Sequence, residues 1–222
     1  MGKDAGMTQL TEVLYLIIGA FAAITLHEYM KALVSYKLGD PLPKARGRLT
    51  LNPLNHFEPI GFICMILTGY GWGKPVTTAA TYYKDRKKGT LLTYISPSVA
   101  NLMAGVVLSF LADFVLAYVI FRNLGPAALF PEEIVLDAPL RPWYIVYRLL
   151  QAIAGANVAI AFFNMIPVYP LDGAKILAMR LTPGQQIKFA AYEKIFQIIL
   201  VIAMFTDWVG MLLRPLQNVF IG

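Results

Sequence analysis

The stretch VLYLIIGAFAAITLHEYMKALVSY, residues 13–36, places a histidine, a glutamate and a lysine inside an otherwise apolar segment. The segment is long enough for one membrane-spanning helix, because a hydrocarbon core of about 30 Å requires roughly 20 helical residues. Charged groups at membrane depth cost at least about 2.5–3.5 kcal/mol each on insertion scales. His27, Glu28 and Lys31 therefore require a specific explanation.

The composition of the whole chain agrees with a membrane location. Of its 222 residues, 58% are hydrophobic and 14% are charged, and the mean hydropathy is +0.60. Soluble domains average about 45–50% apolar and roughly 25% charged residues. We therefore predict a single integral membrane domain over residues 1–222. The net charge of +6 does not indicate nucleic-acid binding, because the basic residues fall between apolar runs and form no stripe with exposed aromatics.

The predicted fold class is an all-α polytopic membrane protein with about four transmembrane helices and a re-entrant β-hairpin or loop segment. The spans are expected at about 13–36, 91–121, 143–167 and 189–213. The second is longer than a membrane requires, so we expect a tilt, or a break at the SPS sequence of residues 96–98. The re-entrant segment covers about residues 47–76. Alternation in RLTLN (48–52), with proline and glycine at both ends, favours strands there.

The distribution of basic residues predicts the orientation. The connections after the first and third spans, together with the re-entrant segment, hold 13 of the 19 lysines and arginines. These are Lys37, Lys44, Arg46, Arg48, Lys74, Lys84, Arg86, Lys87, Lys88, Lys175, Arg180, Lys188 and Lys194. We expect this side to be cytoplasmic and both termini to lie outside. The N-terminus lacks a basic region and a cleavage signal, so no removable signal peptide is expected.

The polar residues of the first span follow part of a known metal-binding pattern. A histidine four residues after His27 would share its helical face and complete H-E-x-x-H, the zinc motif of metalloproteases. Lys31 occupies that position. Asp172 is the other deep acid, in a segment interrupted by Pro167 and Pro170. In an intact zinc peptidase, two histidines and an aspartate would hold the metal and a glutamate would deprotonate its water. A packed polar cluster is the alternative explanation.

Four motifs in order resemble the site-2 protease family of intramembrane zinc metalloproteases. They are HEYMKALVSYKLGDPLPKARGRLTLNPLNHFEPIG (27–61), GWGKPV (71–76), SPSVAN (96–101) and NMIPVYPLDGAKIL (164–177). The chain is most similar to short bacterial and archaeal members without a PDZ domain. The resemblance implies a three-helix core with added spans, an embedded β-hairpin, and cleavage of a partner's transmembrane segment.

Carried over by position, the resemblance makes Glu28 the catalytic base and His27 and Asp172 zinc ligands. Asn101 and Asn164 match asparagines thought to line the site or bind an unwound substrate. Two positions depart from the family pattern. Ser96 replaces a glycine, which is a mild change, and Lys31 replaces the second histidine ligand.

Lysine at this position changes the expected chemistry. A charged lysine has no lone pair for a metal, and its ammonium would repel Zn²⁺ in a site of low dielectric constant. We expect zinc, the family's cofactor, to be absent or weakly bound. Instead, Lys31 is expected to pair with Asp172 and with Glu28. His56, the only other histidine, is a possible substitute ligand.

These observations favour a catalytically inactive pseudoprotease that binds the transmembrane segment of a client in the bilayer, in a prokaryotic plasma membrane. An active zinc metalloendopeptidase with an unorthodox third ligand is the alternative. An ion transporter or channel that uses the same buried charges is a third hypothesis. Paired repeats, which many transporters contain, are not evident in the sequence. The sequence specifies neither the oligomeric state nor the client.

Overall fold

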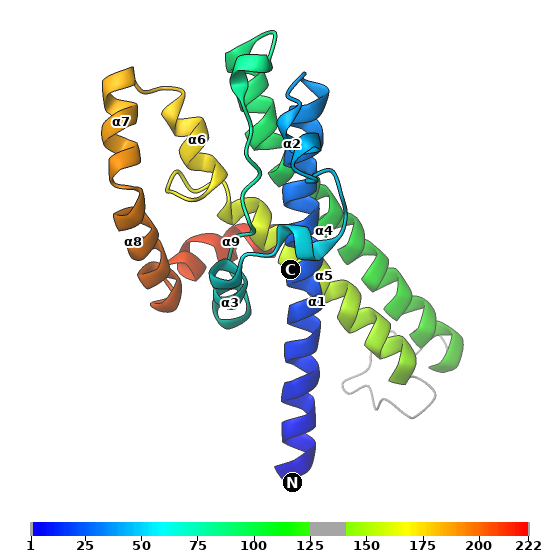
Figure 1. The fold of residues 1–222 in the computed structure, drawn as a ribbon. Helices are drawn as coiled ribbons and strands as arrows, with labels where there is room; N and C mark the ends of the chain where they lie inside the picture. Colours follow the sequence, from blue (N-terminus) through cyan, green and yellow to red (C-terminus); the bar gives the residue numbers. More distant parts are fainter. Residues whose placement is uncertain (1, 125–140, 222) are drawn as a thin grey trace.

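The computed structural model describes residues 2–124 and 141–221, and its described elements are all helical. Three long helices, α1 (Gly2–Lys37), α4 (Arg86–Leu124) and α5 (Arg141–Phe163), cross one another and form the centre of the molecule (Figure 1). Each contains a segment long and apolar enough to span a membrane. The first three predicted spans are therefore confirmed as helices, although the third ends at Phe163 and not at Pro167.

Close approach of these helices depends on two glycines. A Cβ on Gly19 of α1 would lie 2.7 Å from the carbonyl oxygen of Ala152 in α5. A Cβ on Gly105 of α4 would lie 2.4 Å from Cγ2 of Val158, also in α5. Small residues are typical where membrane helices cross, because they let the backbones come together. The two glycines allow α1 and α4 to pack closely against α5.

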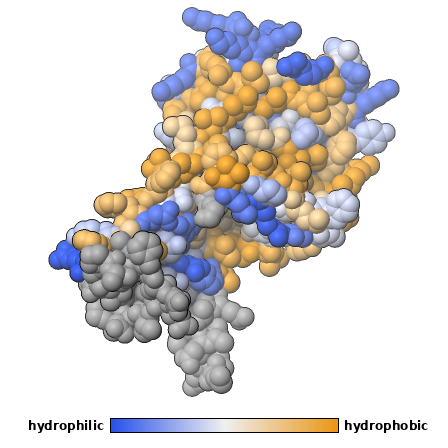
Figure 2. Space-filling view, turned by 180° about the vertical axis from the view of Figure 1, so that it is seen from behind, coloured by the Kyte–Doolittle hydropathy of each residue, from blue (hydrophilic) through white to orange (hydrophobic). Residues whose placement is uncertain are grey.

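Helix α4 runs without interruption through Pro97. The break considered at residues 96–98 does not occur, so tilt is the remaining way for this long helix to fit a membrane. Farther along, Met103, Val107, Phe110 and Phe114 are all at least 64% exposed and recur at the spacing of one helical face. Such a face suits contact with lipid. Figure 2 shows hydrophobic residues gathered over the body of the molecule, with hydrophilic residues at its upper end.

The fourth predicted span is divided between helices in the structure. Residues 189–213 fall on the end of α7 (Pro183–Ala191), on α8 (Glu193–Phe205) and on the beginning of α9 (Trp208–Ile221). Helices α8 and α9 meet at 68°, and Asp207 between them has a positive φ of 65°. The left-handed conformation of Asp207 ends one helix and redirects the chain. The pair is either one broken span or a re-entrant loop.

The predicted β-hairpin is wrong within the described residues. Residues 47–76 contain a 3₁₀ helix, η1 (Pro53–His56), the helix α3 (Pro59–Thr68) and extended loops. Local signals favour these helices over the weak alternation of residues 48–52. Asn52 and Glu58 cap them, each is followed by proline, and Gly69 ends α3 with φ 81°. At about 1.5 Å per residue, α3 is too short to cross a membrane, as expected.

Apolar packing holds α3 and the C-terminal helices onto the central bundle. Cys64 of α3 belongs to a buried cluster with Phe163, Leu200 and Leu213, among others. Cys64 is 4% exposed, so its thiol lies in apolar surroundings. A second cluster joins Met65 to α1 and α5. Two further elements, α2 (Leu42–Ala45) and η2 (Ala80–Tyr82), belong to the loops after α1 and before α4.

Candidate functional site

Four ionisable side chains meet in the interior of the bundle. His27, Glu28 and Lys31 come from the C-terminal third of α1, and Asp172 is the first residue of α6 (Asp172–Ala178). Each is between 2% and 4% exposed. Every residue of the predicted catalytic and metal set is therefore buried at one place, even though 145 positions separate His27 from Asp172.

A tight turn after α5 brings Asp172 to this place. Prolines at 167 and 170 end the regular helix, and the N–H of Gly173 donates to the carbonyl oxygen of Asn164 at 2.7 Å. A Cβ on Gly173 would lie 2.3 Å from the carbonyl oxygen of Met165, so the turn requires glycine. The chain thus folds back on itself, and the Asp172 carboxylate faces α1.

Lys31 lies between the two carboxylates. Its Nζ is 3.0 Å from Oε1 of Glu28 and 2.8 Å from Oδ1 of Asp172. The expected pairing of Lys31 with both acids is therefore observed. The second oxygen of Glu28, Oε2, accepts the N–H of Val76 at 2.9 Å. Both oxygens of the predicted base are consequently engaged within the protein.

His27 bridges Asp172 and an asparagine. The amide nitrogen of Asn101 donates to the carbonyl oxygen of Ala23 and to Oδ1 of Asn157, so its own Oδ1 is the atom that faces Nδ1 of His27, at 3.0 Å. Nδ1 therefore bears a hydrogen, an assignment that follows from the network. Nε2 of His27 is 3.0 Å from Oδ2 of Asp172. If Nε2 had no hydrogen, its lone pair would point at the negative carboxylate oxygen and be repelled. One proton therefore lies between Nε2 of His27 and Oδ2 of Asp172.

The cluster is electrically balanced in this arrangement. His27 and Asp172 share a proton and sum to zero charge, and the Lys31 ammonium cancels the Glu28 carboxylate. Unpaired charges in a medium of low dielectric constant are costly, whereas a neutral hydrogen-bonded set is tolerated. The lysine thus completes a self-contained polar cluster.

Asparagine side chains form hydrogen bonds beside the cluster. Asn101 is fully buried, and its side chain is engaged by His27, Ala23 and Asn157. Asn157 was not among the residues predicted from the sequence. An amide inside the apolar run of α5 was the available signal, because buried polar groups in a membrane need partners. The side chain of Asn164 donates to the carbonyl oxygen of Ile160 at 3.1 Å.

His56, the possible substitute ligand, lies on η1 and is fully buried. Its Nε2 is 2.8 Å from the carbonyl oxygen of Thr50, and its Nδ1 has no hydrogen-bond partner among the residues that the structure describes. Burial lowers the pKa of His56, which favours the neutral imidazole. His56 is close enough to Glu28 and Lys31 to sense their charges.

The fold and the buried cluster define a polytopic membrane protein that encloses ionisable groups among its helices. The chain belongs to peptidase family M50, the site-2 protease family, whose model matches residues 12–206. It is 30% identical over 204 residues to "Putative zinc metalloprotease YwhC" of Bacillus subtilis, covering 92% of this chain and 86% of that protein.

A second relative is more distant. The chain is 24% identical over 196 residues to "Putative zinc metalloprotease Rip2" of Mycolicibacterium smegmatis, covering 86% of this chain and 66% of that protein. No solved structure matches the chain significantly. Zinc is therefore the metal expected from the names of these relatives, and the residues at the site can be compared with that expectation.

The residues at this site do not fit a zinc ion. Zinc sites in catalytic proteins have three protein ligands and an open position. Here only His27 and Asp172 could serve, and the ammonium of Lys31 stands 2.8 Å from the aspartate oxygen. Within residues 2–124 and 141–221, no group of three or more histidine, cysteine, aspartate or glutamate side chains is arranged to hold a metal. Lys31 holds the carboxylates together in the way a metal would, but it provides no Lewis acid.

Proposed function

We propose that this M50 protein is a pseudoprotease that binds a transmembrane segment of a client protein without cleaving it. One observation supports the loss of catalysis: Lys31 Nζ contacts both Glu28 and Asp172, at 3.0 and 2.8 Å. A general base must reach the water that it deprotonates. Glu28 instead accepts hydrogen bonds from Lys31 and from the N–H of Val76.

Lys31 is also a poor metal ligand for energetic reasons. To bind zinc it would have to release its proton and abandon two buried carboxylates. Breaking a buried ion pair by removing one partner costs about 3–5 kcal/mol. Because both partners of Lys31 are buried acids, loss of its proton would leave the cluster with one uncompensated negative charge. The protonated form is therefore the stable one.

Client binding is proposed from the location of the cluster. His27, Glu28 and Lys31 lie within α1, which is apolar enough to span a membrane. Asp172 contacts them from α6, so a partner reaching the cluster would do so from the bilayer. Asn164, at the end of α5, is proposed to contact the client. Asn101 is proposed to position His27, because its amide is already engaged within the protein. The prokaryotic plasma membrane, with both termini outside, is the proposed location.

An active metallopeptidase is the second candidate, and one observation favours it. Nδ1 of His56 is buried and has no hydrogen-bond partner within residues 2–124 and 141–221. A neutral imidazole nitrogen of this kind is a suitable zinc ligand. A rearrangement that brings His56 to His27 and Asp172 would complete a three-ligand set, which is consistent with the names of the relatives.

The test is the zinc content of the purified protein, compared with Lys31→His and a matched Lys37→His variant. Lys37 is exposed at the end of the same helix. We expect essentially no zinc in the parent and in Lys37→His, and about one zinc per chain in Lys31→His, because only that change restores three ligands. Stoichiometric zinc in the parent that disappears in a His56→Gln variant would refute the proposal and establish the second candidate.

Client binding is tested separately. Crosslinking in native membranes, with a photoreactive residue in place of Asn164, should capture a membrane protein, and the crosslink should map to its transmembrane segment. The same residue placed at Phe110, on the exposed face of α4, serves as the control for random lipid-phase encounters. Equal capture from both positions would contradict a specific client groove.

A further inference from the structure

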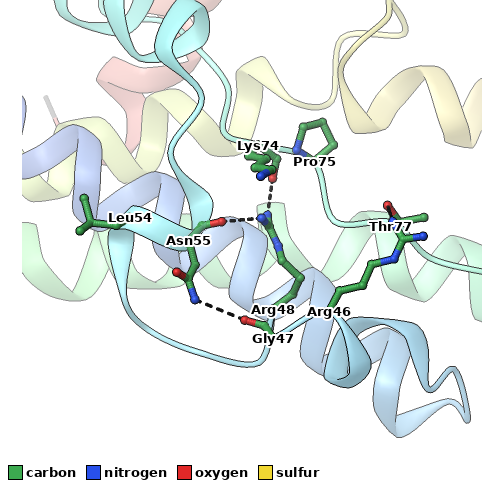
Figure 3. A pocket seen from close by; sticks show the side chains of 8 residues that line it. All are labelled: Arg46, Gly47, Arg48, Leu54, Asn55, Lys74, Pro75 and Thr77. Atoms are coloured by element: carbon green, nitrogen blue, oxygen red, sulfur yellow. Dashed lines mark hydrogen bonds between the residues drawn. The ribbon is translucent and has the colours of Figure 1, made fainter.

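A pocket of about 450 Å³ lies apart from the buried cluster, where the loop after α2 meets η1 and the segment before η2 (Figure 3). Three cationic residues line it: Arg46, Arg48 and Lys74. The other lining residues are Gly47, Leu54, Asn55, Pro75 and Thr77, so no acidic side chain is among them. The described residues of the wall therefore carry a formal charge of +3 and include no acid that would neutralise it.

Arg48 is a built-in part of this pocket. It is only 7% exposed, and its two terminal nitrogens donate to the carbonyl oxygens of Asn55 and Lys74. Figure 3 shows its guanidinium held between these two chain segments. The two carbonyl groups orient the guanidinium but leave its full charge in place. Its Nε has no hydrogen-bond partner in the described part of the chain. Glu28, the acid that attracts Arg48, is itself paired with Lys31.

The other two cations are more accessible. Nη1 of Arg46 donates to the hydroxyl oxygen of Thr77 at 2.8 Å, and Lys74 is exposed at the opposite wall. Pockets that gather arginine and lysine without acids are suited to phosphate, because guanidinium groups match its oxygens and ammonium adds a point charge. The chemistry of the lining therefore indicates an anion with several acceptor oxygens.

The surroundings of the pocket indicate contact with the membrane surface. Leu54, in its wall, is 72% exposed, and Leu51 and Ile60 in the same segment are each 63% exposed. Exposed leucines and isoleucines beside cations are typical of surfaces that lie at the level of lipid headgroups. The pocket also belongs to the set of connections that contains most of the basic residues.

We propose that this pocket binds a phosphate group, supplied either by the headgroup of an anionic phospholipid or by a soluble phosphate ester. The group would lie between Arg46 and Lys74, over the guanidinium of Arg48. Occupation would also affect the buried cluster. Pro75 and Thr77 line the pocket, and the residue between them, Val76, donates its N–H to Glu28. A bound phosphate would thus fix the segment that covers Glu28.

The test measures binding to delipidated protein in a neutral detergent. The probes are a short-chain phosphatidylglycerol, inorganic phosphate, and a short-chain phosphatidylcholine as the zwitterionic control. The variant is Arg46→Gln with Lys74→Gln, which leaves the structural bonds of Arg48 intact. The control, Lys84→Gln with Lys87→Gln, removes the same charge from exposed residues outside the pocket.

The parent should bind phosphatidylglycerol or phosphate, and phosphatidylcholine much more weakly. The pocket variant should lose about tenfold or more in affinity, because two charge-assisted contacts are removed. The control should stay within about twofold of the parent, as expected for screened surface charges. Binding of inorganic phosphate identifies a soluble ligand, and binding of phosphatidylglycerol alone identifies a lipid headgroup.

Two results would overturn the proposal. One is equal affinity of the parent for phosphatidylcholine and phosphatidylglycerol, and the other is an equal loss in the pocket and control variants. If the pocket variant melts at a lower temperature without ligand, the charge-preserving pair Arg46→Lys with Lys74→Arg replaces it. That pair must retain binding, since the charges remain, and its failure to bind while folded would also refute the site.

Discussion

Replacing Lys31 with methionine should strongly destabilise the protein. Methionine keeps most of the length of the side chain but removes the ammonium that contacts Glu28 at 3.0 Å and Asp172 at 2.8 Å. At an effective dielectric constant of about 20, each contact has a gross Coulomb attraction of about 5–6 kcal/mol. The desolvation of buried ions offsets much of this attraction, and removing one partner of a buried pair typically costs about 3–5 kcal/mol. We expect a loss in that range.

The assay is reversible unfolding in mixed micelles, which gives the free energy of unfolding for Lys31→Met and for Lys37→Met. Lys37 is exposed on the same helix, so its variant should change stability by about 0.5 kcal/mol or less. In the double variant Lys31→Met with Glu28→Gln, part of the loss should be recovered, because one uncompensated carboxylate is gone. A loss below about 1 kcal/mol for Lys31→Met would refute the reasoning that this cluster depends on its ammonium.

Three further predictions concern the fold and the cluster. Gly105→Ala should lower the free energy of unfolding by about 1–3 kcal/mol, because the added methyl group overpacks the helix crossing. Gly184→Ala should be nearly neutral, because the space around Gly184 is open, and unfolding measurements on both variants compare the two effects. In a cysteine-free background, Lys87→Cys and Arg122→Cys, at the two ends of α4, should react with an impermeant thiol reagent from opposite sides of the membrane, and labelling from one side would contradict a spanning α4. In the Lys31→His background, Asn101→Leu should weaken zinc binding by about 10–100-fold, because it removes the partner that orients the site histidine, and unchanged affinity would argue against that role.

The long helices were predictable because their information is local. The apolar runs of residues 13–36 and 91–121 require only that backbone groups be satisfied within the segment, which a helix achieves in any apolar surroundings. The same logic was less successful near the C-terminus. The apolar run of residues 189–213 contains Asp207, whose left-handed backbone conformation separates two helices. Hydropathy alone does not predict that Asp207 adopts this backbone conformation and divides the run into two helices.

The β-hairpin was predicted wrongly because its hydrogen-bonding groups have other partners. An extended segment becomes a strand when a neighbouring strand takes its N–H and carbonyl groups. Here the N–H of Val76 goes to Glu28, and the carbonyl oxygens of Asn55 and Lys74 go to Arg48. Val76 and Glu28 are 48 positions apart, and Lys74 and Arg48 are 26 apart, so the alternation of residues 48–52 could not reveal this competition.

The candidate site was only partly predictable. The spacing of His27 and Lys31 on one helical face, and the motif around Asp172, were enough to nominate the residues and to predict their pairing. The role of Asn157 as the partner of Asn101 was not visible, because it depends on how α4 and α5 cross. Gly105 permits that close crossing, and nothing in its local sequence distinguishes it from other glycines.

By itself the sequence determined the membrane class, the three long helices and the identity of the ionisable residues, because hydrophobicity and helical periodicity act over short stretches of chain. Only the tertiary structure decided that Asn157 accepts from Asn101, that the Val76 N–H caps Glu28, and that three cations converge on one pocket. Those arrangements depend on how α4 and α5 cross and on loops that fold back over α1, and therefore on contacts between residues far apart in the chain.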